Sequence, residues 1–203
     1  MLVGADELMM YEIIFYGRGG QGGVTAANIL VHAALYQKLY GQGFPFFGAE
    51  RRGAPVMAFA RISDKPIVRH GMFYEADILV ILDHKLIDIG ATKKVYVRDN
   101  GYVIVNMPSD YEIDYGKFNI LGKARFYGVN AKKIALENKL VVAGWPVVNT
   151  SMLGALSKAT KIISVENIMK AIKSYFGGRV GEANAKAAFQ AYNETPLIRE
   201  VNM

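Results

Sequence analysis

The chain has 203 residues, of which 52% are hydrophobic and 21% charged, and this balance is typical of a soluble globular protein with one buried core. Its formal charge of +6 permits nucleic-acid binding, but the basic residues are scattered, so we expect no nucleic-acid partner. The chain contains no cysteine, which excludes disulfides, thiolate zinc sites and any iron–sulfur cluster held by this chain alone.

No apolar run reaches the roughly 18–20 residues that a membrane span needs, so we expect no membrane association. The start of the chain contains Asp6 and Glu7 and lacks the pattern of a secretory signal, and together with the missing disulfides this favours a cytoplasmic location. No repeat or linker divides the sequence. Residues 1–203 are therefore predicted to form a single domain, with residues 1–9 frayed.

Taken in chain order, the first predicted unit is a strand, a glycine-rich loop and a helix. Residues 11–16 (YEIIFY) form a β-branched and aromatic run that predicts a strand. Residues 24–39 carry apolar side chains at helical spacing and predict a helix that Gly41 and Gly43 terminate.

The middle of the chain predicts a β-hairpin followed by strands. Residues 58–63 and 66–70 flank the pair Asp64-Lys65, which is typical of a hairpin turn. The following segments are mostly apolar, as strands buried on both faces are, and predict strands over residues 76–82, 101–107 and, more weakly, 124–129.

The last third of the chain is predicted to be mainly helical, with Ser164 as a cap and Gly177-Gly178 as a stop. The helices are predicted over residues 131–138, 150–160, 165–176 and 183–192. The predicted fold class is therefore α/β: three-layer, with a mainly parallel sheet, a β-hairpin insertion and a Rossmann-like first strand, glycine loop and helix. In such sheets the ligand crevice lies beyond the carboxyl ends of the strands, where the glycines are.

The segment GRGGQGG joins the first predicted strand to the first predicted helix. Glycines permit a positive φ and a close approach of the backbone to a ligand, and N–H groups at the start of a helix attract anionic oxygens. Arg18 could add a bidentate phosphate contact. The candidate phosphate-binding residues are Gly17, Arg18, Gly19, Gly20, Gln21, Gly22 and Gly23.

Two familiar nucleotide sites do not fit this loop. A dinucleotide site expects an acidic residue about 20 residues further on, but residues 39–47 (LYGQGFPFF) contain none and the first acid is Glu50. A Walker loop requires a following Gly-Lys-Ser/Thr, which is also missing. A tight strand–helix turn that binds nothing remains an alternative.

Three further groups of residues are candidates for a site. Residues 48–56 (GAERRGAPV) hold Glu50, Arg51 and Arg52 between small-residue turns, which favours a shaped loop for phosphate or carboxylate over a solvated charge cluster. Residues 149–156 (NTSMLGAL) predict a capped and closely packed helix. The last group is the histidines: His32, His70 and His84 lack ligand spacing, so no metal site is expected, and Asp83-His84 is either functional or a turn and a cap.

Together these segments resemble the gamma subunits of 2-oxoacid:ferredoxin oxidoreductases, and the E-R-R-G-A-P form resembles the pyruvate or branched-chain members. The family motifs are G-x-G-G-Q-G, G-x-E-x-R-G-A-P, A-F-x-R-I-S, aD-x-L-V and N-T-x-M-L-G-A. They are matched in order by residues 17–22, 48–55, 58–63, 76–80 and 149–155.

The resemblance implies a multi-subunit enzyme that oxidatively decarboxylates a 2-oxoacid, most closely pyruvate, to an acyl-CoA and passes electrons to ferredoxin. It implies partners called alpha, beta and the cluster-bearing delta subunit, which carry thiamine diphosphate, Mg and the iron–sulfur clusters. This chain would then be a subunit without catalytic residues or a bound cofactor of its own.

Within such an enzyme we expect this chain to bind coenzyme A as co-substrate. Its pyrophosphate suits the glycine loop, with Thr25 as a hydroxyl donor, and its 3′-phosphate suits arginine. Arg51, Arg52 and Asn149 are predicted to converge from neighbouring strand ends, with Glu50 orienting one guanidinium. The alternatives are subunit docking through residues 44–47 (FPFF), a purely structural subunit, and an independent nucleotide-binding protein.

Overall fold

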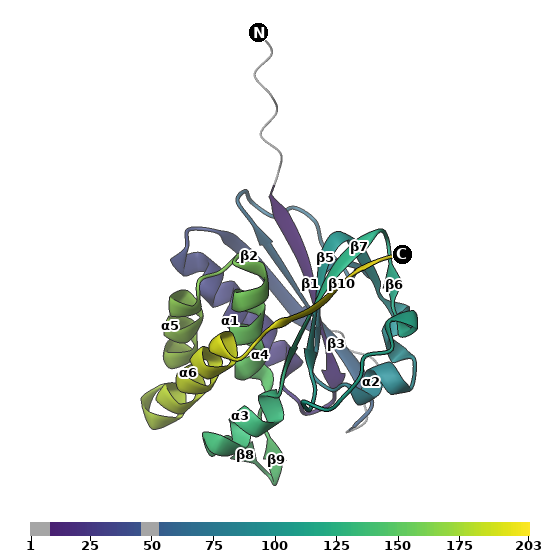
Figure 1. Ribbon diagram of the computed structural model, residues 1–203. Coiled ribbons are helices and arrows are strands. Elements are labelled where there is room, and N and C mark those ends of the chain that lie inside the picture. Colours follow the sequence, from purple (N-terminus) through teal and green to yellow (C-terminus); the bar gives the residue numbers. More distant parts are fainter. Residues whose placement is uncertain (1–8, 46–52) are drawn as a thin grey trace.

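The computed structural model describes residues 9–45 and 53–203. Within them, eight strands form one mixed sheet (Figure 1), in the order β10-β7-β5-β4-β1-β3-β2, with β6 paired to β5. Its core is parallel and consists of β1 (Met10–Arg18), β4 (Glu75–Ile81), β5 (Tyr96–Asn106) and β7 (Lys123–Val129), with the short β6 (Asn119–Ile120). The antiparallel strands are β3 (Pro55–Ser63), β2 (Tyr40–Pro45) and β10 (Leu197–Asn202).

Helices cover the two faces of this sheet unequally. One face carries α1 (Gly23–Tyr36), α3 (Ala131–Glu137), α4 (Asn149–Thr160), α5 (Val165–Phe176) and α6 (Gly178–Asn193) (Figure 1). The other carries only α2 (Lys85–Asp88), the 3-10 turns η1 (Ala91–Lys94) and η2 (Tyr115–Lys117), and loops. The predicted α/β class with a parallel core is confirmed, and its third layer is thin.

Alternation along β1 explains why both faces bury a core. Ile13 and Phe15 point to the helical layer, whereas Ile14 and Tyr16 point to the opposite cluster. Successive side chains of a strand point to opposite faces, so a run that is apolar throughout belongs in the middle of a covered sheet. No helix within residues 9–45 and 53–203 is long and apolar enough to cross a membrane.

The predicted hairpin is wrong in its second strand. Residues 66–70 form no strand, and Val68 is 83% exposed. β3 pairs instead with β2 on one side and β1 on the other. Gly41 and Gly43 do not terminate the first helix, which ends at Tyr36. They lie in β2, where a Cβ on Gly41 would come within 2.9 Å of Val31, so glycine allows this strand to pass close to α1.

Several boundaries also differ from the prediction. Ser164 caps α5 as predicted, accepting the Asn167 N–H at 3.3 Å. β5 begins five residues earlier than predicted and α6 begins at Gly178, directly after the Gly177 that ends α5. Strand β10 and the hairpin of β8 (Val141–Val142) and β9 (Trp145–Pro146) were not predicted, because both segments are short and largely exposed and so lack a strong pattern.

A buried charge network ties the central strands together at the end of the sheet opposite the glycine loop. Arg61 of β3 donates from Nε to Glu12 Oε1 of β1 at 2.8 Å, and Arg98 of β5 donates to Glu12 Oε2 at 2.6 Å. The side chains of Glu12 and Arg61 are only 4% and 3% exposed. Arg61 also donates to Gln42 and to the Gly71 carbonyl.

Candidate functional site

The glycine loop connects β1 to α1 as predicted. Gly20 and Gly22 have φ of 94° and 79°, a backbone conformation that residues with a Cβ rarely adopt. Gly22 directly precedes α1, and no acidic residue lies in the first turn of that helix. The first N–H groups of a helix have no partner within it and carry a partial positive charge, so this end of α1 suits an anion.

The loop is held by its own hydrogen bonds and by β3. The Arg18 N–H donates to Gln21 Oε1 at 2.7 Å, and the Gln21 N–H donates back to the Arg18 carbonyl at 3.0 Å. The Gly19 N–H donates to the Ala54 carbonyl at 3.0 Å, just before β3. Gln21 is therefore a residue that shapes the loop.

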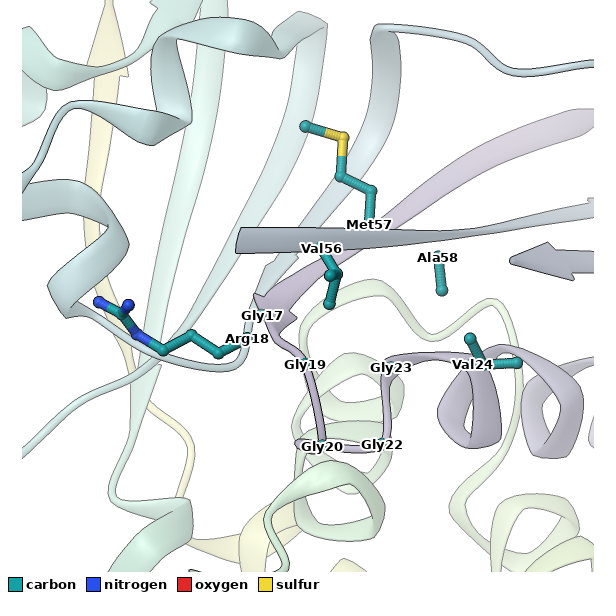
Figure 2. A pocket seen from close by; sticks show the side chains of 10 residues that line it. All are labelled: Gly17, Arg18, Gly19, Gly20, Gly22, Gly23, Val24, Val56, Met57 and Ala58. Atoms are coloured by element: carbon teal, nitrogen blue, oxygen red, sulfur yellow. The ribbon is translucent and has the colours of Figure 1, made fainter. Parts of the chain in front are cut away.

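A cavity of about 240 Å³ lies between the loop and the start of β3. Figure 2 shows the backbone of the loop on one side and, on the other, β3 with the side chains of Val56 and Ala58 directed toward the loop. Its lining residues are Gly17, Arg18, Gly19, Gly20, Gly22, Gly23, Val24, Val56, Met57 and Ala58. Pockets that enclose a whole ligand usually measure about 300–1,000 Å³, so this one is the size of a phosphate-bearing fragment.

Arg18 directs its side chain away from the glycines (Figure 2). Its Nε donates to Asp83 Oδ2 at 2.7 Å, and its Nη1 donates to the Gly53 carbonyl at 3.1 Å. The guanidinium thus ties the loop to Asp83, the second residue after β4, and to Gly53, which follows Arg52 in the sequence. Arg18 thus lines the cavity while its guanidinium fixes the position of the loop.

Asn149 supports the loop from the helical layer. Its side chain is buried, and Nδ2 donates to the Gly22 carbonyl at 3.3 Å while Oδ1 accepts the Thr150 N–H at 2.9 Å. Asn149 is the first residue of α4, and Val148 is the residue that precedes the helix. Asn149 is therefore not the N-cap residue, and its side chain contacts the loop. Thr25 lies partly exposed in the first turn of α1, close to the cavity in sequence.

The structure describes only the end of the predicted loop over residues 48–56. Glu50, Arg51 and Arg52 lie outside the described residues, as do the last two residues of the aromatic segment 44–47. Phe44 stacks on Phe59 with ring centroids 5.3 Å apart and packs against the core, so it is not an exposed docking residue.

Asp83 adjoins the loop through Arg18, and the sequence left it as either a functional residue or part of a turn and a cap. Its Oδ1 accepts the Lys85 N–H at 3.0 Å, as a turn residue does, while Oδ2 holds Arg18. His84 packs edge-on against Tyr111, with ring centroids 4.6 Å apart. The signal for Asp83 was its place at the carboxyl end of a strand parallel and adjacent to β1.

The strand order also bears on the dinucleotide alternative. In a dinucleotide-binding fold, an acid at the end of the second strand reaches the ribose from beside the glycine loop. Here the antiparallel β3 separates β2 from β1, so the end of β2 does not adjoin the loop. In the described part of the chain, no group of three His, Asp or Glu side chains is arranged to hold a metal ion.

Comparison with known proteins identifies the family of this chain. Residues 12–194 match the family model described as pyruvate ferredoxin/flavodoxin oxidoreductase. The "Pyruvate/ketoisovalerate oxidoreductases common subunit gamma" of Pyrococcus furiosus is 47% identical over 93% of this chain and 99% of its own. The "Pyruvate synthase subunit PorC" of Methanothermobacter thermautotrophicus is 45% identical over 96% of this chain and 100% of its own.

A solved structure extends the match to three dimensions. The pyruvate oxidoreductase subunit PORC from Thermotoga maritima superposes with a TM-score of 0.76 at 34% identity, covering 94% of this chain and 99% of that one. The family match, the relatives and the solved structure cover nearly the whole chain, and they confirm the family that the sequence resembles. The chain therefore belongs to the pyruvate ferredoxin/flavodoxin oxidoreductase family and is a gamma-type subunit of a 2-oxoacid oxidoreductase.

Proposed function

We propose that this chain contributes coenzyme A binding and complex assembly to the oxidative decarboxylation of a 2-oxoacid, foremost pyruvate, to an acyl-CoA. The observation that carries the proposal is the glycine loop at the start of α1, which faces a cavity and has no carboxylate in the first helical turn. The relatives named for pyruvate and ketoisovalerate supply the substrate class. Ferredoxin is the proposed electron acceptor.

Coenzyme A matches this site in two parts. Its pyrophosphate fits the N–H groups at the start of α1, with the Thr25 hydroxyl as a further donor. Its 3′-phosphate suits Arg51 and Arg52, because a planar guanidinium binds phosphate with two hydrogen bonds, and Glu50 orients one of them. Asn149 fixes Gly22 and so acts through the loop.

The remaining chemistry belongs to partner subunits. An iron–sulfur cluster is held by cysteine thiolates, and this chain has no cysteine to supply. We assign the clusters, thiamine diphosphate and Mg to alpha, beta and delta subunits of the same complex, and we place that complex in the cytoplasm. The positive charge of the chain, +6, suits assembly with acidic partners.

Val24→Asp tests the anion site directly. Val24 lines the cavity in the first turn of α1 and is 39% exposed. A carboxylate there stabilises the helix but repels a phosphate, so fold and binding are expected to respond in opposite directions. In the reconstituted complex we expect the KM for coenzyme A to rise about tenfold or more, which corresponds to roughly 1.4 kcal/mol, with kcat at saturation little changed.

Val24→Asn is the matched control, because it has nearly the same shape as Val24→Asp without the charge. Its KM for coenzyme A should stay within about twofold of wild type, since a helix start tolerates asparagine. Equal KM values for the two variants would show that the phosphate does not bind at this loop. The KM for the oxoacid serves as an internal reference that neither variant should change.

Arg52→Ala tests the second half of the site. Loss of a guanidinium that binds the 3′-phosphate should raise the KM for coenzyme A about tenfold and leave that for 3′-dephospho-coenzyme A unchanged. Arg179→Ala, at an exposed position of α6, is the charge-matched control. A similar rise with both coenzymes would place Arg52 away from the 3′-phosphate.

A further inference from the structure

The β8–β9 hairpin presents an apolar surface that nothing within the described chain covers. Val142 and Trp145 are 67% and 69% exposed, and Trp145 is the only tryptophan of the chain. The two residues are direct cross-strand partners, so their side chains lie on the same face of the hairpin. Val142 and Trp145 therefore form one continuous exposed apolar surface, called here the knob.

The hairpin has a defined shape. Its turn residues Ala143 and Gly144 both have a positive φ, 49° and 81°, as the tightest two-residue hairpin turns require. The Val147 N–H donates to the Leu140 carbonyl at 2.8 Å and closes the base of the hairpin. The knob is preformed, which lowers the entropy cost of binding.

Its position links it to the glycine loop. The hairpin and α3 follow the carboxyl end of β7, and the hairpin projects from the same edge of the sheet on which α1 begins (Figure 1). Three residues after β9, Asn149 starts α4 and contacts Gly22. A protein bound to the knob would therefore lie on the same side of the molecule as the glycine-loop cavity, which is too small to enclose a whole coenzyme A.

The charges around the knob select its partner. Residues 131–147 contain three lysines, Lys132, Lys133 and Lys139, all exposed, against the single acid Glu137. Two copies of this chain would bring these positive rims together, and like charges disfavour such a contact. An acidic rim on a different chain is complementary.

We propose that the β8–β9 hairpin docks into an apolar recess with an acidic rim on a partner subunit of the same complex. The exposed knob supplies the buried centre of the contact and the lysines supply its rim. The proposal rests on the proposed function only in that a partner subunit exists. Association is measured without coenzyme A, so its outcome is independent of the coenzyme experiments.

Trp145→Ala and Val142→Asp test the contact. The purified full-length variants are mixed with the remaining subunits of the native complex, and their Kd is measured. Tryptophan at the centre of an interface usually dominates its energy, so we expect association to weaken roughly thirtyfold or more. Val180→Asp is the control, since Val180 on α6 is also exposed, at 56%, but lies in another element. Unchanged association of both hairpin variants would overturn the proposal.

Fluorine NMR of the labelled chain gives a second, independent measurement. With 5-fluorotryptophan, the chain carries one fluorine signal, from residue 145. Its solvent isotope shift should be large in the isolated chain and nearly vanish in the complex. A signal that stays exposed in the complex would overturn the proposal. Binding of the isolated chain to anionic vesicles that Trp145→Ala abolishes, without loss of subunit association, would do so as well.

Discussion

Glu12→Ala is expected to lower the free energy of unfolding of this chain by about 3 kcal/mol, because it leaves the buried Arg61 without its carboxylate. Arg61 is 3% exposed, so water cannot solvate its guanidinium in place of the lost carboxylate. Its bonds to Gln42 and the Gly71 carbonyl remain, as does the face of Phe73, 4.7 Å from the guanidinium carbon, and these limit the loss. Urea unfolding followed by circular dichroism measures the change.

Glu75→Ala is the matched control for this prediction. Glu75 is 60% exposed and lies 3.9 Å from Arg98, so its ion pair is solvated and contributes less than about 0.5 kcal/mol. If Glu12→Ala and Glu75→Ala cost the same, the network around Glu12 does not stabilise the fold. Glu12→Gln should fall between them, because glutamine keeps one acceptor for the arginines.

The acid limb of the stability curve gives the same prediction a second readout. Burial raises the pKa of Glu12, but hydrogen bonds from Arg98 and Arg61 outweigh it and hold the pKa below the ordinary value of 4.5. A carboxyl whose pKa is lowered by folding stabilises the fold fully above its unfolded pKa. That contribution disappears as the pH falls through the folded pKa. Wild type should therefore lose stability below pH 4.5 more steeply than Glu12→Gln.

The sequence predicted those parts of the fold whose signal is local. The strand at residues 11–16 follows from a β-branched run, and the glycine loop follows from residues that adopt a positive φ without strain; both are confirmed. Ser164 was predicted as a cap by the same local logic and caps α5. Gly41 and Gly43 were misassigned because a glycine that ends a helix and one that admits a close neighbour look alike in sequence.

Contacts between residues far apart in the chain could not be predicted from the sequence. Nothing near Arg61 in the sequence indicates that its partner is Glu12, 49 residues earlier. Their pairing explains why the mostly apolar strand β3 carries an arginine. The contact of Arg18 with Asp83 spans 65 residues in the same way. Chemistry-bearing residue types were identifiable, but the direction of each side chain depends on which strands become neighbours.

Gly154→Ala is expected to destabilise the chain by at least about 2 kcal/mol, although alanine favours an exposed helix interior over glycine by about 1 kcal/mol. Packing against α6 determines that the stability falls. A Cβ on Gly154 would overlap the carbonyl of Ala188, which belongs to the backbone and cannot rotate away. The two helices must then separate, against the Thr150–Asn184 hydrogen bond of 2.8 Å.

Ser151→Ala on the same helix separates crowding from a general effect of substitution. Ser151 Oγ is buried and has no hydrogen-bond partner among the described residues, so replacing it should leave stability unchanged or raised. A Gly154→Ala variant as stable as Ser151→Ala would show that α4 can move away at little cost. If Gly154→Ala is instead the less stable variant, we expect the strain in α4 to reach the glycine loop, because α4 starts with Asn149, which contacts Gly22. Gly154→Ala should then also raise the KM for coenzyme A in the reconstituted complex, at a position that does not line the cavity.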